Sequence, residues 1–240
     1  MKAAPRGGAA SSTILFIFRS DGRLLAFSEN KMNIVILAAG MGKRMHSRPP
    51  KVLQPIAGRP MIDHVLDASE GLSASPRVVV VGHAAENVME HLADRSDVTF
   101  ALQSPQLGTG HALRQALGQL DRNEPKTLVC LGDVPLLSRR TLEAIAREAE
   151  TSDLVLLTVE LDNPTGYGRI LRNPAGFVRA IVEEKDASPE ERRVREVNTG
   201  IMCLPTSRLD GWLSSLKAAN AQGEYYLTDV IGLAADEGLT

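Results

Sequence analysis

An uninterrupted apolar run, Ile34-Val35-Ile36-Leu37, leads directly into a glycine-rich, basic loop that extends to Met45. Consecutive apolar residues are typical of a strand that is covered on both faces, as in a parallel sheet. The glycines of the loop let backbone N–H groups approach an anion, and its lysine and arginine supply positive charge. The loop fits neither the Walker pattern nor the G-x-G-x-x-G fingerprint. We therefore expect a nucleotide site of another kind.

After Met32, strand-like runs alternate with helix-like runs. This alternation predicts βαβ units and a Rossmann-like α/β fold, with a mostly parallel sheet flanked by helices. The expected strands are Ile34–Ala38, Val78–Val81, Val98–Leu102, Leu128–Leu131 and Leu154–Leu161. The expected helices are Pro60–Ala68, Ala84–Ala93, Gly110–Leu120, Thr141–Glu150 and Tyr226–Ala235.

The pattern changes after Leu161. Short strands over Gly168–Leu171 and Phe177–Val182 surround a turn cluster and predict a hairpin. A further strand is expected at Asn198–Leu204, and the charged segment Asp186–Glu196 is expected to be a surface loop or short helix. The sequence thus predicts one core domain with a smaller β-rich part that binds the second substrate.

Charge and composition exclude several classes of function. The net charge of -2 and the scattered basic residues do not favour nucleic-acid binding. No apolar run approaches the roughly 20 residues of a membrane span. Cys130 and Cys203 lie in apolar runs without metal-ligand spacing, so we expect buried, reduced thiols and a cytoplasmic protein. Residues 1–31 differ in composition and are expected to be a disordered or non-native extension, with Met32 as an alternative start and residues 32–240 as the domain.

Polar groups that follow the predicted strands are the candidate ligands, because open α/β sheets bind ligands beyond the carboxyl ends of their strands. In chain order they are Gly40, Gly42, Arg44, Lys51, the segment Gln103–Gly110, Asp133, Glu183 and Asn198.

Two of these groups suggest specific chemistry. Asp133 ends a strand, where one carboxylate can hold Mg²⁺ together with phosphates and waters. The amide of Gln103 offers both a donor and an acceptor, which suits a pyrimidine edge. The plainer alternatives are an aspartate that caps the next turn and an ordinary strand-to-helix connection. His111, at the start of the next helix, is expected to be a packing residue.

The order of the short motifs resembles that of sugar-phosphate nucleotidyltransferases. More narrowly, it is similar to the uridyltransferase domain of bacterial bifunctional N-acetylglucosamine-1-phosphate uridyltransferase/glucosamine-1-phosphate acetyltransferases. The resemblance covers Asn33 to Gly238. Its motifs are Leu37–Met45 with Pro50-Lys51, Gln106–Ala112, Pro164–Ile170, Glu183–Ala187, Asn198–Ile201 and Asn220–Asp229.

The resemblance implies that UTP and N-acetylglucosamine 1-phosphate react to give UDP-N-acetylglucosamine and pyrophosphate with Mg²⁺ as cofactor. It implies binding of uracil and ribose by Leu37, Ala38, Ala39, Gly40 and Gln103, with Gly108 and Thr109 on the uridine side. It implies that Arg44 and Lys51 face the triphosphate, that Asp133 binds Mg²⁺ and is catalytic with them, and that Leu131 and Gly132 join the substrate-binding set. Gly168, Glu183 and Asn198 would contact the acetamido sugar.

The chain departs from that family at three places. Lys43 stands where the family often has Thr, Leu131 stands where it often has Tyr, and no E-G-V-N-like segment with a second metal-binding Asn is present. We therefore expect a C-terminally truncated, weakly active fragment without the acetyltransferase domain. Full-length family members are expected to be trimeric through that domain, and this chain monomeric. The alternatives are a nucleotidyltransferase for another sugar phosphate and a UDP-sugar-binding protein without turnover.

Overall fold

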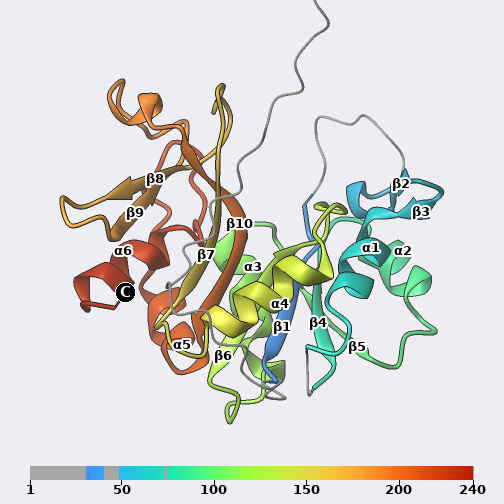
Figure 1. The fold of residues 1–240 in the computed structure, drawn as a ribbon. Coiled ribbons are helices and arrows are strands. Elements are labelled where there is room, and N and C mark those ends of the chain that lie inside the picture. The colour runs from blue at the N-terminus through green and yellow to red at the C-terminus, as the bar shows by residue number, and fades with distance from the viewer. Residues whose placement is uncertain (1–30, 41–48, 73–74, 240) are drawn as a thin grey trace, which may run out of the picture.

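The computed structural model describes residues 31–40, 49–72 and 75–239, which fold around an eight-stranded sheet with helices on both faces (Figure 1). A separate two-stranded hairpin carries β2 and β3. The predicted N-terminal extension lies outside the described residues except for Lys31. The strands are β1 Asn33–Leu37, β2 Pro55–Ile56, β3 Arg59–Pro60, β4 Arg77–Val81, β5 Val98–Leu102, β6 Lys126–Leu131, β7 Val155–Glu160, β8 Arg169–Arg172, β9 Val178–Val182 and β10 Glu196–Pro205.

The main sheet has the order β5-β4-β1-β6-β10-β8-β9, and β7 also pairs with β10. β5, β4, β1 and β6 are parallel neighbours, whereas β10 runs antiparallel to β6, β7 and β8. Since β7 and β8 both oppose β10, they point the same way as β6, and only β9 and β10 run in reverse. The predicted α/β fold with a mostly parallel orientation is confirmed.

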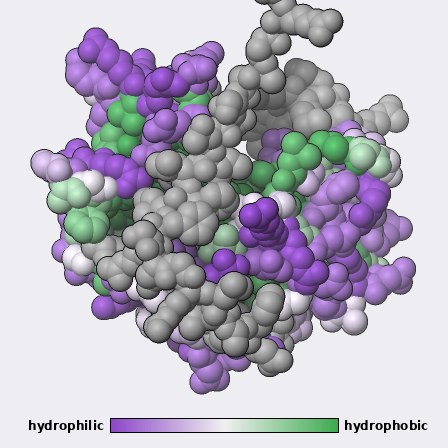
Figure 2. Space-filling model, in the orientation of Figure 1, coloured by the Kyte–Doolittle hydropathy of each residue, from purple (hydrophilic) through white to green (hydrophobic). Residues whose placement is uncertain are grey.

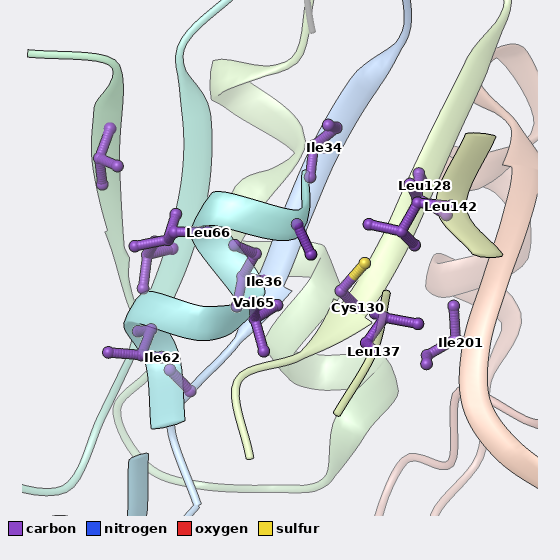
Figure 3. Close-up of a cluster of buried hydrophobic side chains, with 14 of the residues drawn as sticks. Ile34, Ile36, Ile62, Val65, Leu66, Leu128, Cys130, Leu137, Leu142 and Ile201 are labelled. Carbon is purple, nitrogen blue, oxygen red and sulfur yellow. The ribbon is translucent and has the colours of Figure 1, made fainter. Parts of the chain in front are cut away.

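The continuous apolar character of β1 follows from its central place in the sheet. Ile34 and Ile36 face a core cluster to which α1, α2 and α4 contribute, and Figure 3 shows part of that cluster. Val35 and Leu37 face the opposite cluster, to which α3, α5 and α6 contribute. Successive side chains of a strand point to opposite faces, so a strand covered on both faces is apolar at every position.

The helices bury one apolar stripe each. They are α1 Met61–Ala68, α2 Ala85–His91, α3 Thr109–Ala116, α4 Arg139–Glu148, α5 Thr206–Ser215 and α6 Asp229–Asp236. α4 begins after Ser138, whose hydroxyl accepts a hydrogen bond from the backbone N–H of Thr141 at 3.1 Å. Such a cap satisfies one of the donors that the first turn of a helix leaves unpaired.

Two helices differ from the sequence expectation. α5 was not predicted, because polar residues and Gly211 obscure the buried spacing of Leu209, Trp212 and Leu213. The last helix begins at Asp229 rather than at Tyr226. The three residues before Asp229 instead pack against two other parts of the chain, as described below.

The β-rich part is a continuation of the main sheet. β8 and β9 form the predicted hairpin and join the sheet through the long strand β10 (Figure 1). The charged segment Asp186–Glu196 is a loop with a single 3₁₀ turn at Glu191–Arg193, as expected. One continuous sheet therefore carries both halves of the candidate substrate site.

The molecular surface is mixed in character. Figure 2 shows hydrophilic residues over much of the outer face in this orientation, with smaller apolar areas between them. Among the described residues, no helix is long and apolar enough to cross a membrane.

Candidate active site

Four neighbouring parallel strands end at one edge of the sheet, and their following residues meet there. Backbone hydrogen bonds hold these connections together: Ala38 N–H donates to Val80 at 2.9 Å, and Gly132 N–H donates to Leu37 at 2.9 Å. Gln103 N–H donates to the carbonyl of Val81 at 2.8 Å. The edge thus collects backbone groups and short loops, which is the usual ligand-binding place of such a sheet.

Two glycines make this edge closely packed. A Cβ atom on Gly82 would lie 2.8 Å from the Cβ of Ala39 and 2.9 Å from its carbonyl oxygen. A Cβ on Gly132 would lie 3.2 Å from Cγ1 of Val52 and 3.4 Å from the Cβ of Ala38. Gly132 belongs to the predicted site. Gly82 was not predicted, although its position directly after the four consecutive valines of β4 is a usable signal.

Lys51 and Asp133 form an ion pair across this edge. Lys51 begins a 3₁₀ turn, Lys51–Leu53, which is anchored by the buried side chain of Val52. Asp133 follows β6 directly, beyond Leu131 and Gly132. The fold therefore brings together two charged residues that are distant in sequence. Arg44, the third predicted catalytic residue, lies outside the described residues, as does most of the glycine-rich loop.

The expected uridine side lies at the end of β5. The side-chain amide nitrogen of Gln103 donates to the carbonyl of Gly108 at 2.9 Å and lies 3.1 Å from Nδ1 of His111. Gly108 has φ = +105°, and a Cβ on it would come within 2.7 Å of the carbonyl oxygen of Tyr225. That position requires glycine for both its backbone angle and its close contact.

The segment from Asn220 to Thr228 is hydrogen-bonded to the residues on the expected uridine side. Tyr225 N–H donates to the carbonyl of Leu107 at 2.8 Å, and Gly110 N–H donates to the carbonyl of Tyr225 at 2.8 Å. The hydroxyl of Thr109 accepts a hydrogen bond from the backbone N–H of Leu227 at 3.0 Å. Thr109 therefore holds two segments of the chain together, whatever it does toward a ligand.

Gly168, Glu183 and Asn198 also come together, as the sugar assignment requires. The backbone N–H of Asn198 donates to the carbonyl of Gly168 at 2.9 Å. A Cβ on Gly168 would lie 3.3 Å from Oε1 of Glu183. The hydroxyl of Thr228 donates to that same carboxylate oxygen at 3.1 Å. Thr228 was not predicted as part of the site.

The carboxyl of Glu183 is largely buried and lies near other acidic groups. Burial raises the pKa of its carboxyl, the hydrogen bond from Thr228 opposes this change, and the charges of Asp229 and Asp186 add to it. Burial and the charge of Asp186 also raise the pKa of Asp229. This end of the site therefore disfavours additional negative charge, in contrast to the Lys51 end.

Leu131 lies beside a bulge in β10, the strand between the Lys51 end and the Glu183 end of the site. The pairing of β10 with β7 shifts between Asn198 and Met202, and Gly200 within this bulge has φ = +82°. A Cβ on Gly200 would lie 2.5 Å from Cδ1 of Leu131. Bulges re-aim side chains next to functional sites, and this one begins directly after Asn198.

The carboxylate of Asp133 suits Mg²⁺, which accepts a single protein carboxylate when phosphates and waters complete its shell. Among residues 31–40, 49–72 and 75–239, no group of three His, Cys, Asp or Glu side chains forms a metal cluster.

A surface hollow of about 480 Å³ lies elsewhere, between β9 and α6. Its lining includes Phe177, Arg179 and Asp236 but none of the strand-end residues described above. Of the hollow and the sheet edge, the sheet edge is the one that combines backbone donors, an ion pair and a polar amide. We therefore place the candidate site at the sheet edge.

A mixed α/β sheet with a glycine-lined carboxyl edge and a basic residue beside a carboxylate is typical of nucleotide-binding α/β proteins. Residues 34–199 match the MobA-like NTP transferase domain, and the chain belongs to this family.

Individual relatives are also similar. The chain is 59% identical over 208 residues to the bifunctional protein GlmU of Cupriavidus pinatubonensis, covering 87% of this chain and 45% of that protein. It is 60% identical over 208 residues to the bifunctional protein GlmU of Azoarcus sp., covering 87% and 46%. The chain thus spans about half the length of these relatives.

Solved structures share the fold at low identity. A putative glucose-1-phosphate thymidylyltransferase from Bacillus anthracis superposes with a TM-score of 0.69 at 20% identity, covering 87% of this chain and 84% of that one. A UDP-glucose pyrophosphorylase in complex with UDP-glucose gives 0.69 at 17% identity, covering 88% and 89%. These likenesses confirm the Rossmann-like architecture.

Proposed function

We propose that the chain is a uridyltransferase that converts UTP and N-acetylglucosamine 1-phosphate into UDP-N-acetylglucosamine and pyrophosphate. The observation that carries the proposal is the ion pair of Lys51 and Asp133 at the sheet edge where Gln103 also follows its strand, with Glu183 and Asn198 on the same continuous sheet. The high identity to bifunctional GlmU proteins over 208 residues supports the choice of substrates.

The reaction needs charge stabilisation more than a strong base. A phosphate oxygen of the sugar phosphate, ionised at pH 7, attacks the α-phosphorus of UTP, and the bond to the leaving pyrophosphate breaks. The barrier comes from bringing two polyanions together and from the charge that builds on the leaving group. In this proposal Lys51 neutralises that charge, and Arg44 assists it from the glycine-rich loop.

Asp133 is proposed to hold Mg²⁺, which when bound neutralises phosphate charge and orients the triphosphate. The ion pair between Lys51 and Asp133 has a consequence for this assignment. Binding of the nucleotide gives the ammonium of Lys51 a phosphate partner and leaves the carboxylate of Asp133 for the metal. Until the nucleotide binds, the opposite charges of Lys51 and Asp133 therefore neutralise each other.

The remaining residues are proposed to bind the two substrates. The nucleoside is proposed to lie against the backbone of Leu37, Ala38, Ala39 and Gly40. The absence of a side chain at Gly82 leaves room beside this backbone, because a Cβ atom there would collide with Ala39. Gly108 and Thr109 line the uridine side. Gly168, Glu183 and Asn198 accept the acetamido sugar.

The cellular setting is proposed to be the cytoplasm. The free thiols of Cys130 and Cys203 are buried, which is compatible with a reducing compartment.

The test is pyrophosphate release by the 240-residue chain with UTP, Mg²⁺ and a panel of sugar phosphates. We expect turnover with N-acetylglucosamine 1-phosphate to exceed that with glucose 1-phosphate or galactose 1-phosphate, and to disappear when EDTA removes the metal. Preference for another sugar phosphate would contradict the substrate assignment. Binding of UDP-N-acetylglucosamine without any pyrophosphate release would favour a binding protein over an enzyme.

A further inference from the structure

His111 and Gln103 form a contact that the proposed reaction does not use. Gln103 is 3% exposed, so the direction of its amide is set by its neighbours. Its Nε2 atom lies 2.9 Å from the carbonyl oxygen of Gly108 and 3.1 Å from Nδ1 of His111. These two neighbours determine which end of the amide remains for a ligand.

The carbonyl of Gly108 fixes which end of the amide points inward. A carbonyl oxygen only accepts hydrogen bonds, so the group beside it must be the NH₂ of Gln103. One amide proton goes to that carbonyl, and the other faces Nδ1 of His111. In the part of the chain that the structure describes, no donor contacts the amide oxygen. Oε1 is therefore the atom that Gln103 offers to a ligand.

This arrangement requires a particular form of the His111 ring. Nδ1 must be an unprotonated acceptor, so the single proton of the neutral ring lies on Nε2. Nε2 lies 3.2 Å from the side-chain amide nitrogen of Gln115, which also lies 3.2 Å from the backbone carbonyl oxygen of His111. Since a neutral ring carries a single N–H, one of the two amides beside it must turn its oxygen toward the ring. The bond from Gln103 to Gly108 is the shorter at 2.9 Å, so we assign the turn to Gln115, which gives up its bond to the His111 carbonyl and accepts the Nε2 proton. Burial and the charge of Arg114 lower the pKa of His111, which keeps the ring neutral at pH 7.

The ring itself is held in place. His111 lies in the first turn of α3, and the ring of Tyr225 is 6.4 Å away between centroids. The neighbouring residue Gly110 donates its N–H to the carbonyl of Tyr225 at 2.8 Å. The start of α3, which carries His111, is therefore hydrogen-bonded to the segment that carries Tyr225, and this anchors the position of Nδ1.

We infer that His111 is a positioning residue that sets nucleobase selectivity by fixing the Gln103 amide with its oxygen toward the ligand. This inference rests on the proposed function. A bare oxygen acceptor pairs with the ring N–H of uracil or thymine. It meets only a lone pair on the corresponding ring nitrogen of cytosine, and an acceptor left facing an acceptor is unfavourable. The site thereby selects bases that carry a ring N–H.

The experiment compares His111→Phe, which removes the acceptor, with His111→Asn, whose Oδ1 can replace Nδ1. UTP and CTP are compared by kcat/KM for pyrophosphate release and by calorimetric binding to the 240-residue chain with Mg²⁺. We expect the UTP-to-CTP ratio to fall on the order of tenfold in His111→Phe and to stay within about twofold of wild type in His111→Asn. A purely structural role of His111 would weaken both nucleotides equally and leave the ratio unchanged.

A second variant guards against misfolding. His111→Gln can reach the place of Nε2 but leaves that of Nδ1 empty, so it should lose selectivity as His111→Phe does. A wild-type ratio in the folded Phe or Gln variant overturns the inference alone and leaves the proposed function standing. A wild-type chain that binds UTP no better than CTP also overturns it. A wild-type chain that binds neither nucleotide overturns the proposed function as well.

Discussion

The parallel and antiparallel halves of the sheet build their parts of the site differently. Beside β5, β4, β1 and β6, the site consists of strand-end loops, glycines and backbone N–H groups. Beside β8, β9 and β10, it consists of the side chains of Glu183 and Asn198 around Gly168. Strand ends of a parallel sheet gather backbone donors that suit phosphate. Strand bodies and hairpins instead present individual side chains, which suit the hydroxyl and amide groups of a sugar.

One segment connects the two halves without being a strand. Toward the antiparallel half, Thr228 bonds Glu183, and the amide of Gln222 accepts from Lys185 at 2.8 Å. Toward the parallel half, Tyr225 and Leu227 bond to the segment that precedes and starts α3. The relative position of the two half-sites therefore depends on Asn220–Thr228 as well as on the sheet.

The largest effect is expected at the charged pair of the parallel half. Lys51→Ala and Asp133→Ala should each lower kcat/KM on the order of a hundredfold or more, because each removes charge stabilisation of the phosphates. Steady-state pyrophosphate release measures this, with the exposed Lys217→Ala as the matched control. Arg44→Ala is expected to act similarly from the sequence alone. Turnover near wild type in Lys51→Ala would make that residue a surface charge only.

The next effect tests the close packing of the parallel half. Gly82→Ala should weaken UTP binding on the order of tenfold and destabilise the fold by about 1–3 kcal/mol, because its Cβ meets the backbone of Ala39. Calorimetry and denaturant unfolding measure the two effects. Gly118→Ala is the matched control, since a Cβ there meets nothing within 4 Å. Equal behaviour of the two variants would show that the edge adjusts freely.

A smaller and more selective effect is expected in the antiparallel half. Glu183→Ala should raise the KM for N-acetylglucosamine 1-phosphate about tenfold while UTP binding changes less than about twofold, because the side chain lies on the sugar side only. The exposed Glu190→Ala serves as the control. Equal weakening of both substrates would remove the distinction between the two half-sites.

The smallest effect concerns stability against pH. The pKa of Glu183 is raised in the folded protein, so the native state binds its proton more tightly than the unfolded state. Stability is then highest below the ordinary glutamate pKa and is lost as pH rises through the raised value. Glu183→Gln should flatten this decline in the unfolding free energy between mildly acidic and neutral pH. A decline as steep as that of the wild type would assign it to Asp229 instead.

Local patterns predicted the parallel half well. The apolar runs of β1, β4, β5 and β6 follow from burial on both faces, and a group at a strand end has a predictable place. Lys51, Gln103 and Asp133 were therefore expected at one edge, and the structure brings Lys51 and Asp133 into contact. Gly82 was missed because a single glycine after a strand does not reveal which backbone passes beside it. α5 was missed because its helical spacing is weak in a polar segment.

By itself, the sequence determined the α/β class, the order of the main elements and the residue types at the strand ends, because these depend on local apolar spacing and turn chemistry. Only the tertiary structure decided which distant residues meet. Thr228 reaches Glu183, Leu227 reaches Thr109, and His111 reaches Gln103 through hydrogen bonds. Such contacts depend on register, helix placement and the path of residues 220–228, and no local pattern encodes the direction of a buried amide.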